Sequence, residues 1–332
     1  MSRCYILGSG FSRICGLPLA SELTPQVFEH AYAEDEDFKD EARMAYRSML
    51  RNLYPGYDFK TSWPDFEELI TVLDEWELYR QDYEGINITK QVFNPSHLKS
   101  ILMRHLPQIL CEKTTSCPRD KKDIVTQFVK HVVQSGDSII SFNWDLLLEV
   151  NCLEARIPVK YDNSSSDALI LIKPHGSLNL VELPRSDYEE AKESFNVHSL
   201  TEIYAENDWV VLQSNDPRES LARILIPFGI GLLVEPSTRK SYQSIWIQVQ
   251  WRRALNILKA VNEIVIIGYS LPRTDFRPRI LLQLAMLNRE SPPSLQIIDP
   301  EAKQLIEHYR QYILTGISTS DTSWDAWFRK SS

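Results

Sequence analysis

Three polar residues suited to catalysis each follow a short apolar stretch of this sequence. Asn143 and Asp145 come directly after residues 138–142, and His175 comes shortly after residues 168–172. An imidazole titrates near neutral pH, which suits a general base. Asn143 and Asp145 could orient a substrate or a water molecule by hydrogen bonds. Asn and Asp are also common at helix N-termini, so a capping role for this pair stays open beside the catalytic one.

A glycine-rich turn lies near the N-terminus, directly after the apolar residues 5–7. Gly8, Gly10 and Gly16 are three of only eleven glycines in the chain. Glycine lets a backbone turn tightly and bring N–H groups against a ligand. A strand, a glycine turn and a helix commonly cradle a pyrophosphate. Arg13 stands where the third glycine of the dinucleotide fingerprint belongs, so a turn without a ligand is the alternative.

Strands and helices are expected to alternate along much of the chain. Expected strands cover residues 5–7, 138–142, 168–172, 209–212, 224–228, 263–267 and 295–298, and helices are expected at 19–31, 242–261, 277–287 and after 301. This alternation predicts an α/β fold with a doubly wound, mostly parallel, Rossmann-like sheet. Such a sheet binds ligands at the carboxyl ends of its strands, where the polar residues above are expected to lie.

Residues 36–135 are mostly helical in pattern and are expected to form a helical insertion subdomain. Apolar positions recur at helical spacing, for example at residues 66, 69, 70 and 73 and at residues 98, 101, 102 and 106. We interpret residues 1–332 as a single catalytic domain that contains this insertion. The insertion is expected to pack beside the sheet and to cover the site or form a subunit interface.

The composition and net charge of the chain exclude some classes of protein. The chain has 332 residues, a net charge of −9 and 43% hydrophobic residues. This charge argues against broad binding of nucleic acid, which needs a basic surface. The longest apolar run, residues 224–234, is far shorter than the ~20 residues of a membrane span. With no apparent leader segment, we expect a cytoplasmic protein without a direct membrane or nucleic-acid partner.

The five cysteines are expected to be free thiols in a reducing compartment. Cys111 and Cys117 are close in sequence, but no second close pair accompanies them, as a four-ligand zinc site usually requires. We therefore expect no metal.

Several motifs together resemble the sirtuin-like (SIR2-like) domain family, in order from residue 4 to about residue 305. The similar stretches are Gly8-Ser9-Gly10-Phe11-Ser12 with Gly16-Leu17-Pro18, Asp65-Phe66-Glu67, Ser141-Phe142-Asn143-Trp144-Asp145, His175-Gly176, Glu235-Pro236-Ser237-Thr238-Arg239-Lys240, and Gly268-Tyr269-Ser270-Leu271-Pro272 with Asp275.

Two departures indicate which branch of that family the chain is similar to. Protein-deacylating sirtuins carry a four-cysteine zinc ribbon after the His-Gly pair, whereas no cysteine follows Gly176 here. Their opening motif continues with Asp-Phe-Arg, whereas Leu19-Ala20-Ser21 follows Pro18. The chain thus resembles the branch of NAD hydrolases of prokaryotic antiviral defence, which lacks the zinc ribbon.

The resemblance implies an NAD⁺ hydrolase that releases nicotinamide and ADP-ribose, with NAD as substrate and no metal. It implies that Asn143 orients the nicotinamide ribose or the attacking water, that Asp145 binds the nicotinamide amide, and that His175 is the general base. It places the pyrophosphate at Gly8, Ser9, Gly10 and Ser12, and the adenosine at Gly268, Tyr269 and Ser270. Asp299 could bind the adenosine ribose or simply begin a helix.

The resemblance also implies a homo-oligomer that depletes NAD in anti-phage defence after activation by a protein partner. An ATPase of the DNA-translocase type is a candidate for that partner. Three alternatives remain: an NAD-dependent protein deacylase, a non-catalytic NAD-binding assembly module, and a dehydrogenase. The missing cysteines argue against the first, retention of Asn143 and His175 against the second, and the imperfect glycine fingerprint against the third.

Overall fold

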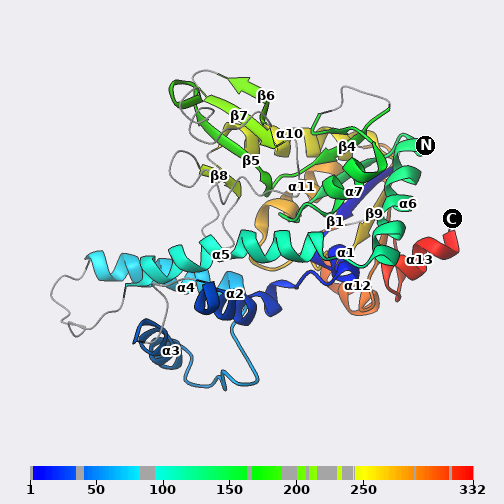
Figure 1. Cartoon of the computed structure of the whole chain (residues 1–332). Coiled ribbons are helices and arrows are strands. Elements are labelled where there is room, and N and C mark those ends of the chain that lie inside the picture. The colour runs from blue at the N-terminus through cyan, green and yellow to red at the C-terminus, as the bar shows by residue number, and fades with distance from the viewer. Residues whose placement is uncertain are drawn as a thin grey trace. The chain divides into compact units, whose positions relative to one another are not determined.

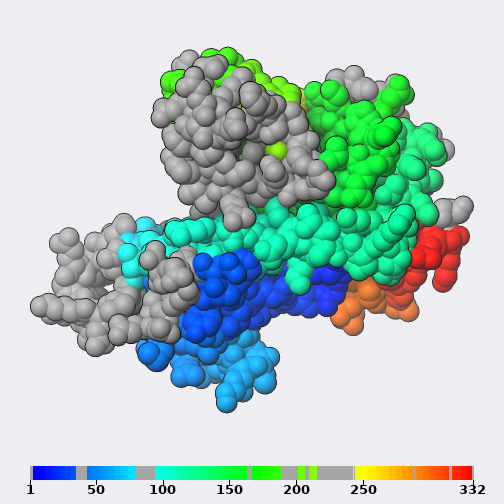
Figure 2. All heavy atoms as spheres, viewed as in Figure 1, coloured from blue at the N-terminus to red at the C-terminus, as the bar shows by residue number. Residues whose placement is uncertain are grey.

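The computed structural model describes residues 3–34, 41–82, 94–162, 167–188, 200–206, 209–214, 230–233, 242, 244–287, 289–313 and 316–331. The other residues are drawn in grey in Figures 1 and 2. They include the expected strand 224–228 and the whole stretch from Glu235 to Lys240 that carries part of the family resemblance, so these two expectations lie outside the described residues.

The chain forms two compact units. The first contains Met1–Leu17, Cys111–Val234 and Ser241–Ser332, and the second contains Pro18–Leu110 and Glu235–Lys240. The second unit begins before residue 36 and ends before residue 135, so its bounds differ from those of the expected insertion. The arrangement of the insertion beside the sheet stays a prediction.

A seven-stranded parallel sheet forms the centre of the first unit, which confirms the doubly wound α/β fold class. Its strand order is β11 (Ile317–Ser320), β10 (Ser294–Ile298), β9 (Glu263–Ile267), β1 (Arg3–Leu7), β2 (Ser138–Ser141), β4 (Leu169–Ile172) and β3 (Val159–Lys160). The apolar strands β2 and β9 are almost fully buried, as parallel strands usually are.

The order of the strands reverses direction at β1. From β1 the chain continues to β2 on one side, and later strands return to pair with β1 on the other side as β9. The carboxyl ends of strands at such a switch point border the crevice where open α/β sheets bind ligands. The loops after β1, β2, β4 and β9 hold most of the expected site residues.

The helices of the first unit are α1 (Ser9–Ser12), the 3₁₀ turn η1 (Arg13–Cys15), α6 (Arg119–Ser135), α7 (Leu147–Ala155), α10 (Ile245–Ala260), α11 (Phe276–Met286), α12 (Ala302–Arg310) and α13 (Trp324–Ser331). Among them, α10, α11 and α12 agree with the expected positions, whereas α1, η1 and α13 were not expected. Helix α6 packs beside α7, as Figure 1 shows. Ser244 is the N-cap of α10, and its hydroxyl accepts a hydrogen bond from Ile247 N.

A second sheet in the first unit was not expected from the sequence. It is antiparallel, with the order β6 (Leu200–Glu206), β7 (Trp209–Ser214), β5 (Gly176–Pro184) and β8 (Ile230–Leu233). Strand β5 starts directly after His175 and is buried over nearly its whole length, and a short 3₁₀ turn, η3 (Arg185–Asp187), follows it. Residues 200–206 were not among the expected strands.

The second unit is helical in the described residues. Its helices are α2 (Ala20–Glu34), α3 (Glu41–Leu53), α4 (Phe66–Asp82) and α5 (Pro95–Thr115), whose last turn runs into the first unit. The apolar positions expected to share helix faces are buried, namely Phe66, Leu69, Ile70 and Leu73 on α4 and Leu98, Ile101, Leu102 and Leu106 on α5.

The prediction that all five cysteines are free thiols is wrong for two of them. Cys15 in η1 and Cys117, just before α6, form a disulfide across 102 residues of sequence. Cys4, Cys111 and Cys152 are thiols outside this disulfide. Their spacing in sequence did not reveal the pair, because two distant segments bring these cysteines together. Among the described residues, no helix combines the length and apolarity needed to cross a membrane.

Candidate active site

The glycine turn after β1 packs backbone against backbone on the loop after β9. Gly8 N donates to Ile267 O at 3.1 Å, and Gly10 N donates to Gly268 O at 2.9 Å. A Cβ added to Gly8 would lie 2.5 Å from Gly268 O, and one added to Gly268 would lie 2.5 Å from the carbonyl carbon of Gly10. Gly268 also has a φ of 59°, which disfavours other residues. The glycines at 8, 10 and 268 thus let two strand-end loops touch.

This contact between the two loops uses backbone N–H groups that were expected to bind a pyrophosphate. The N–H groups of Gly8 and Gly10 already donate to protein carbonyls, and Phe11 N donates to Gly8 O at 2.9 Å. Ser9 is exposed between them. In this structure the glycines shape the turn, and the expected pyrophosphate site cannot rely on their own N–H groups as free donors.

Asn143 joins the loop after β2 to the glycine turn. Its Nδ2 donates to Gly8 O at 2.8 Å and to Ser12 Oγ at 3.2 Å. Both Nδ2 hydrogens are therefore used. Asn143 Oδ1 has no hydrogen-bond partner in the described part of the chain, and the side chain is half-buried. Asn143 can therefore accept a hydrogen bond from a ligand or a water molecule.

Both carboxylate oxygens of Asp145 accept hydrogen bonds from neighbouring residues. Oδ2 accepts from Ser12 Oγ at 2.8 Å, and Oδ1 accepts from Leu147 N at 3.1 Å, at the start of α7. Burial raises the pKa of Asp145 above its ordinary value, although the Lys173 ammonium and the Ser12 hydroxyl act in the opposite direction. These contacts agree with the capping alternative, and the expected contact with a nicotinamide amide stays a prediction.

A buried lysine that the sequence analysis did not single out ties this loop to the end of β4. Lys173 is 1% exposed, and its Nζ donates to Asp145 O at 2.7 Å, Glu149 Oε1 at 3.0 Å and Ser177 Oγ at 2.8 Å. A charged residue directly before Pro174 and His175, at the end of an apolar strand, was the available sequence signal.

His175 lies in an aromatic environment at the carboxyl end of β4. Its ring centroid is 4.9 Å from that of Phe142 and 5.8 Å from that of Trp251. Trp144 Nε1 donates to His175 O at 3.1 Å and holds the backbone. His175 Nε2 and Trp251 Nε1 are both buried and have no hydrogen-bond partner among the described residues. Buried polar atoms rarely lack partners, so these two are candidates for ligand contacts.

Asp275 is a second residue that the sequence analysis did not assign to the site. Its Oδ1 lies 3.5 Å from His175 Nε2, and its Oδ2 accepts a hydrogen bond from Tyr269 Oη at 2.8 Å. Asp275 is only 3% exposed. The Gly268–Asp275 motif contained it, but only the folded chain brings it to the imidazole.

The remaining expected site residues lie in the neighbouring loops. Tyr269 is buried, stacks on Phe142 at 4.8 Å between ring centroids, and so belongs to the surroundings of His175. Burial raises its pKa well above the ordinary value. Ser270 is exposed. Asp299 Oδ1 accepts from Glu301 N at 2.8 Å, just before α12, which agrees with the helix-start alternative. Burial raises the pKa of Asp299 as well.

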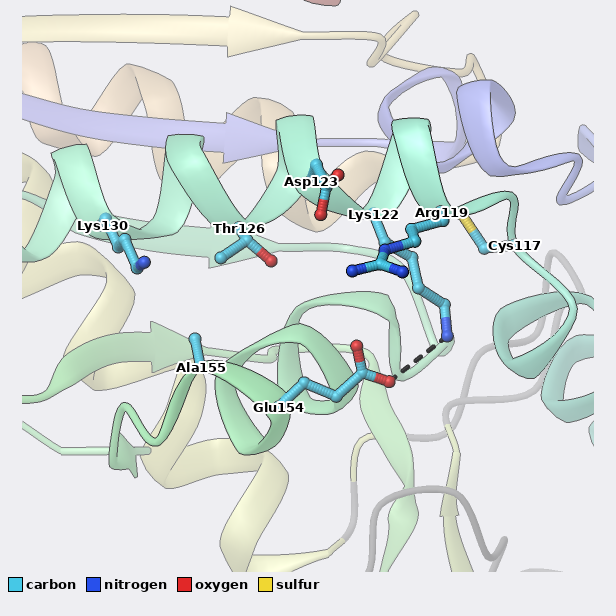
Figure 3. A pocket seen from close by; sticks show the side chains of 8 residues that line it. All are labelled: Cys117, Arg119, Lys122, Asp123, Thr126, Lys130, Glu154 and Ala155. Carbon is cyan, nitrogen blue, oxygen red and sulfur yellow. Dashed lines mark hydrogen bonds and ion pairs between the residues drawn. The ribbon is translucent and has the colours of Figure 1, made fainter.

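A hollow of about 550 Å³ lies elsewhere, between α6 and α7 (Figure 3). Arg119, Lys122, Asp123 and Lys130 line it from α6 and Glu154 lines it from α7, and Lys122 pairs with Glu154 at 3.3 Å. None of the expected site residues lines it. Because its opposite charges largely offset one another, we assign no ligand to this hollow.

No protein-family model matches the sequence, and no curated protein matches it. Among solved structures, a Sir2 homologue in complex with NAD aligns with a TM-score of 0.43 and 12% identity, over 99% of this chain and 87% of that chain. A structure reported on the mechanism and regulation of Sir2 enzymes aligns with a TM-score of 0.40 and 11% identity, over 99% and 90%. Likenesses at this level do not assign a family or a substrate to the chain.

Proposed function

We propose that the loops at the carboxyl ends of β1, β2, β4 and β9 form an active site that hydrolyses NAD⁺ to nicotinamide and ADP-ribose. The observation that carries this proposal is a set of polar atoms without hydrogen-bond partners at one edge of the parallel sheet. Asn143 Oδ1 is a free acceptor among the described residues, and His175 Nε2 and Trp251 Nε1 are buried there without hydrogen-bond partners. The motif resemblance adds the identity of the substrate.

The reaction needs two polar functions near the bond between nicotinamide and ribose. As nicotinamide leaves, the ribose carbon becomes oxocarbenium-like and must be met by a single water molecule. Asn143 Oδ1 would accept a hydrogen bond from that water or from a ribose hydroxyl. His175 would take up the proton that the nucleophile releases.

Neighbouring groups fit this division of roles. Asp275, 3.5 Å from His175 Nε2, would stabilise the imidazolium that forms when His175 accepts a proton. The rings of Phe142 and Trp251 restrict the access of further water to the imidazole. Asp145 and Lys173 hold the loop that carries Asn143.

The biological setting is proposed from the motif resemblance. We propose that NAD depletion serves anti-phage defence in the cytoplasm, after activation by a protein partner such as a DNA-translocase-type ATPase. The alternative is an NAD-dependent protein deacylase, because such an enzyme would use the same asparagine and histidine. Its requirement for an acylated lysine peptide separates the two.

The test is to incubate purified protein with NAD, alone and with the product of a neighbouring gene, and to measure nicotinamide release by chromatography. His175→Ala and Asn143→Ala are each expected to lower turnover about 10²–10⁴-fold, the usual contribution of acid–base groups. His131→Ala and the exposed Asn262→Ala serve as matched controls in the same unit and should leave turnover unchanged.

Two results would contradict the proposal. If nicotinamide release requires an acyl-lysine peptide, the protein is a deacylase. If His175→Ala cleaves NAD as fast as the parent protein, His175 is not the base.

A further inference from the structure

Helix α11 is apolar on two of its faces. One face is buried in the first unit and includes Leu281, Leu282 and Ala285. The other face is exposed and carries what we call the α11 stripe: Phe276 at 62%, Ile280 at 51%, Leu284 at 39% and Leu287 at 55% exposure. Phe276, Ile280 and Leu284 are four positions apart and share one side of the helix, and Leu287 follows directly after the last helical residue.

The stripe is unusual for this chain. Four of the ten large apolar side chains that are exposed in the described residues lie on it, whereas the others are spread over several elements. The apolar face of a helix in a globular protein is normally buried. Contiguous apolar patches on soluble proteins commonly mark interaction sites. We therefore expect another protein surface to bind the exposed apolar face of α11.

The pattern of the stripe fits a second copy of the same chain. In a two-fold contact each residue meets a partner that meets it in return. If two α11 helices lie antiparallel and their two-fold axis crosses the stripe midway between Ile280 and Leu284, Ile280 of one copy faces Leu284 of the other. Phe276 then faces Leu287, so every residue of the stripe meets an apolar residue.

The charged residues beyond the two ends of α11 also favour antiparallel pairing of two copies. The exposed Arg273 precedes the helix, and the exposed Glu290 follows it. Antiparallel pairing brings Arg273 of each copy to the end where Glu290 of the other lies, whereas parallel pairing would bring like charges together. Arg277, another exposed cation at this end, already lies 3.8 Å over the Tyr242 ring.

We propose that the α11 stripe is the contact through which two copies of this chain associate, antiparallel, about a two-fold axis that crosses the stripe midway between Ile280 and Leu284. The four apolar side chains would form the dry centre of the contact, and the end charges would form part of its polar rim. This proposal does not depend on the reaction that the site performs.

The first test measures the mass of the protein in solution by light scattering after size-exclusion chromatography. The parent chain is expected at about 77 kDa, twice its 38.5 kDa, or at a multiple of that mass. The double variant Ile280→Glu, Leu284→Glu is expected to halve the mass, because it buries four carboxylates in the contact. Leu153→Glu, at a site 43% exposed on α7, should leave the mass unchanged.

Circular dichroism and thermal unfolding would show that the variants are folded, which is expected because the substituted side chains are exposed. Phe276 is left unchanged because it adjoins Asp275, beside His175. A parent protein that is monomeric at micromolar concentration, or a double variant that keeps the parent mass, would overturn the proposal.

The second test examines the register. Gln283 is exposed next to the proposed axis, so Gln283→Cys should form a disulfide with its own copy under mild oxidation, and Leu153→Cys should not. Arg273→Glu and Glu290→Arg should each weaken the dimer by about 2- to 25-fold, because each dimer contains two such exposed pairs. The two changes combined should restore it. Failure of the cross-link or of this restoration would show that another surface covers the stripe.

Discussion

Removal of the Lys173 amino group tests how the site is held together. Lys173→Met keeps an unbranched side chain of similar length and removes three hydrogen bonds, to Asp145 O, Glu149 Oε1 and Ser177 Oγ. It also leaves the Glu149 carboxylate, 3% exposed, without its counter-ion. Breaking a buried ion pair by removing one partner typically costs about 3–5 kcal/mol. We therefore expect the free energy of unfolding to fall by about that amount.

A double variant separates the stability effect from the effect on the site. Lys173→Met with Glu149→Gln removes both charges, so most of the lost stability should return, since no unpaired charge stays buried. The carbonyl of Asp145 still lacks its donor in this variant. The loop that carries Asn143 should then be positioned less well, and kcat for NAD cleavage should stay reduced while KM changes less.

The assays are urea unfolding followed by circular dichroism, and nicotinamide release at saturating NAD. Lys122→Met is the matched control, because Lys122 pairs with Glu154 at 3.3 Å with side-chain exposures of 19% and 50%. Exposed pairs contribute only about 0–1 kcal/mol. A Lys173→Met protein as stable as the Lys122→Met protein, or a double variant no more stable than Lys173→Met alone, would refute this reasoning.

Three further predictions follow from the geometry of the same loops. Asp275→Asn should keep the hydrogen bond from Tyr269 and lower kcat by about tenfold or more, because a nearby carboxylate stabilises a protonated imidazole; unchanged steady-state kinetics would contradict this. Gly268→Ala should destabilise the protein by about 2–5 kcal/mol in urea unfolding, because its Cβ would meet Gly10 and Phe11 at a φ of 59°, whereas Gly316→Ala, with open space around it, should have little effect. Burial raises the pKa of the Asp145 carboxyl above 3.8, so the carboxyl binds a proton more tightly in the folded protein than in the unfolded chain. The unfolding free energy of the parent protein, relative to that of Asp145→Asn, should therefore fall as pH rises above 3.8. A difference in unfolding free energy that stays constant across this pH range would disprove the shift.

Local patterns in the sequence determined the main elements of the fold. The strands β1, β2, β4, β9 and β10 and the helices α10 and α11 were found within one or a few residues of their observed bounds. Their signals are apolar periodicity and glycine or polar residues at strand ends, which depend only on near neighbours in the chain. Since the ends of parallel strands meet at one edge, these signals also indicated where a site would form.

Only the tertiary structure decided which side chains meet there. Asp275 reaches His175 across 100 residues of sequence, and Lys173 reaches Glu149 across 24. The disulfide between Cys15 and Cys117 spans 102 residues. The antiparallel sheet around β5 likewise pairs strands from separate segments. The energy of such contacts comes from burial and charge pairing between distant segments, and no local pattern records which segments the fold will bring together.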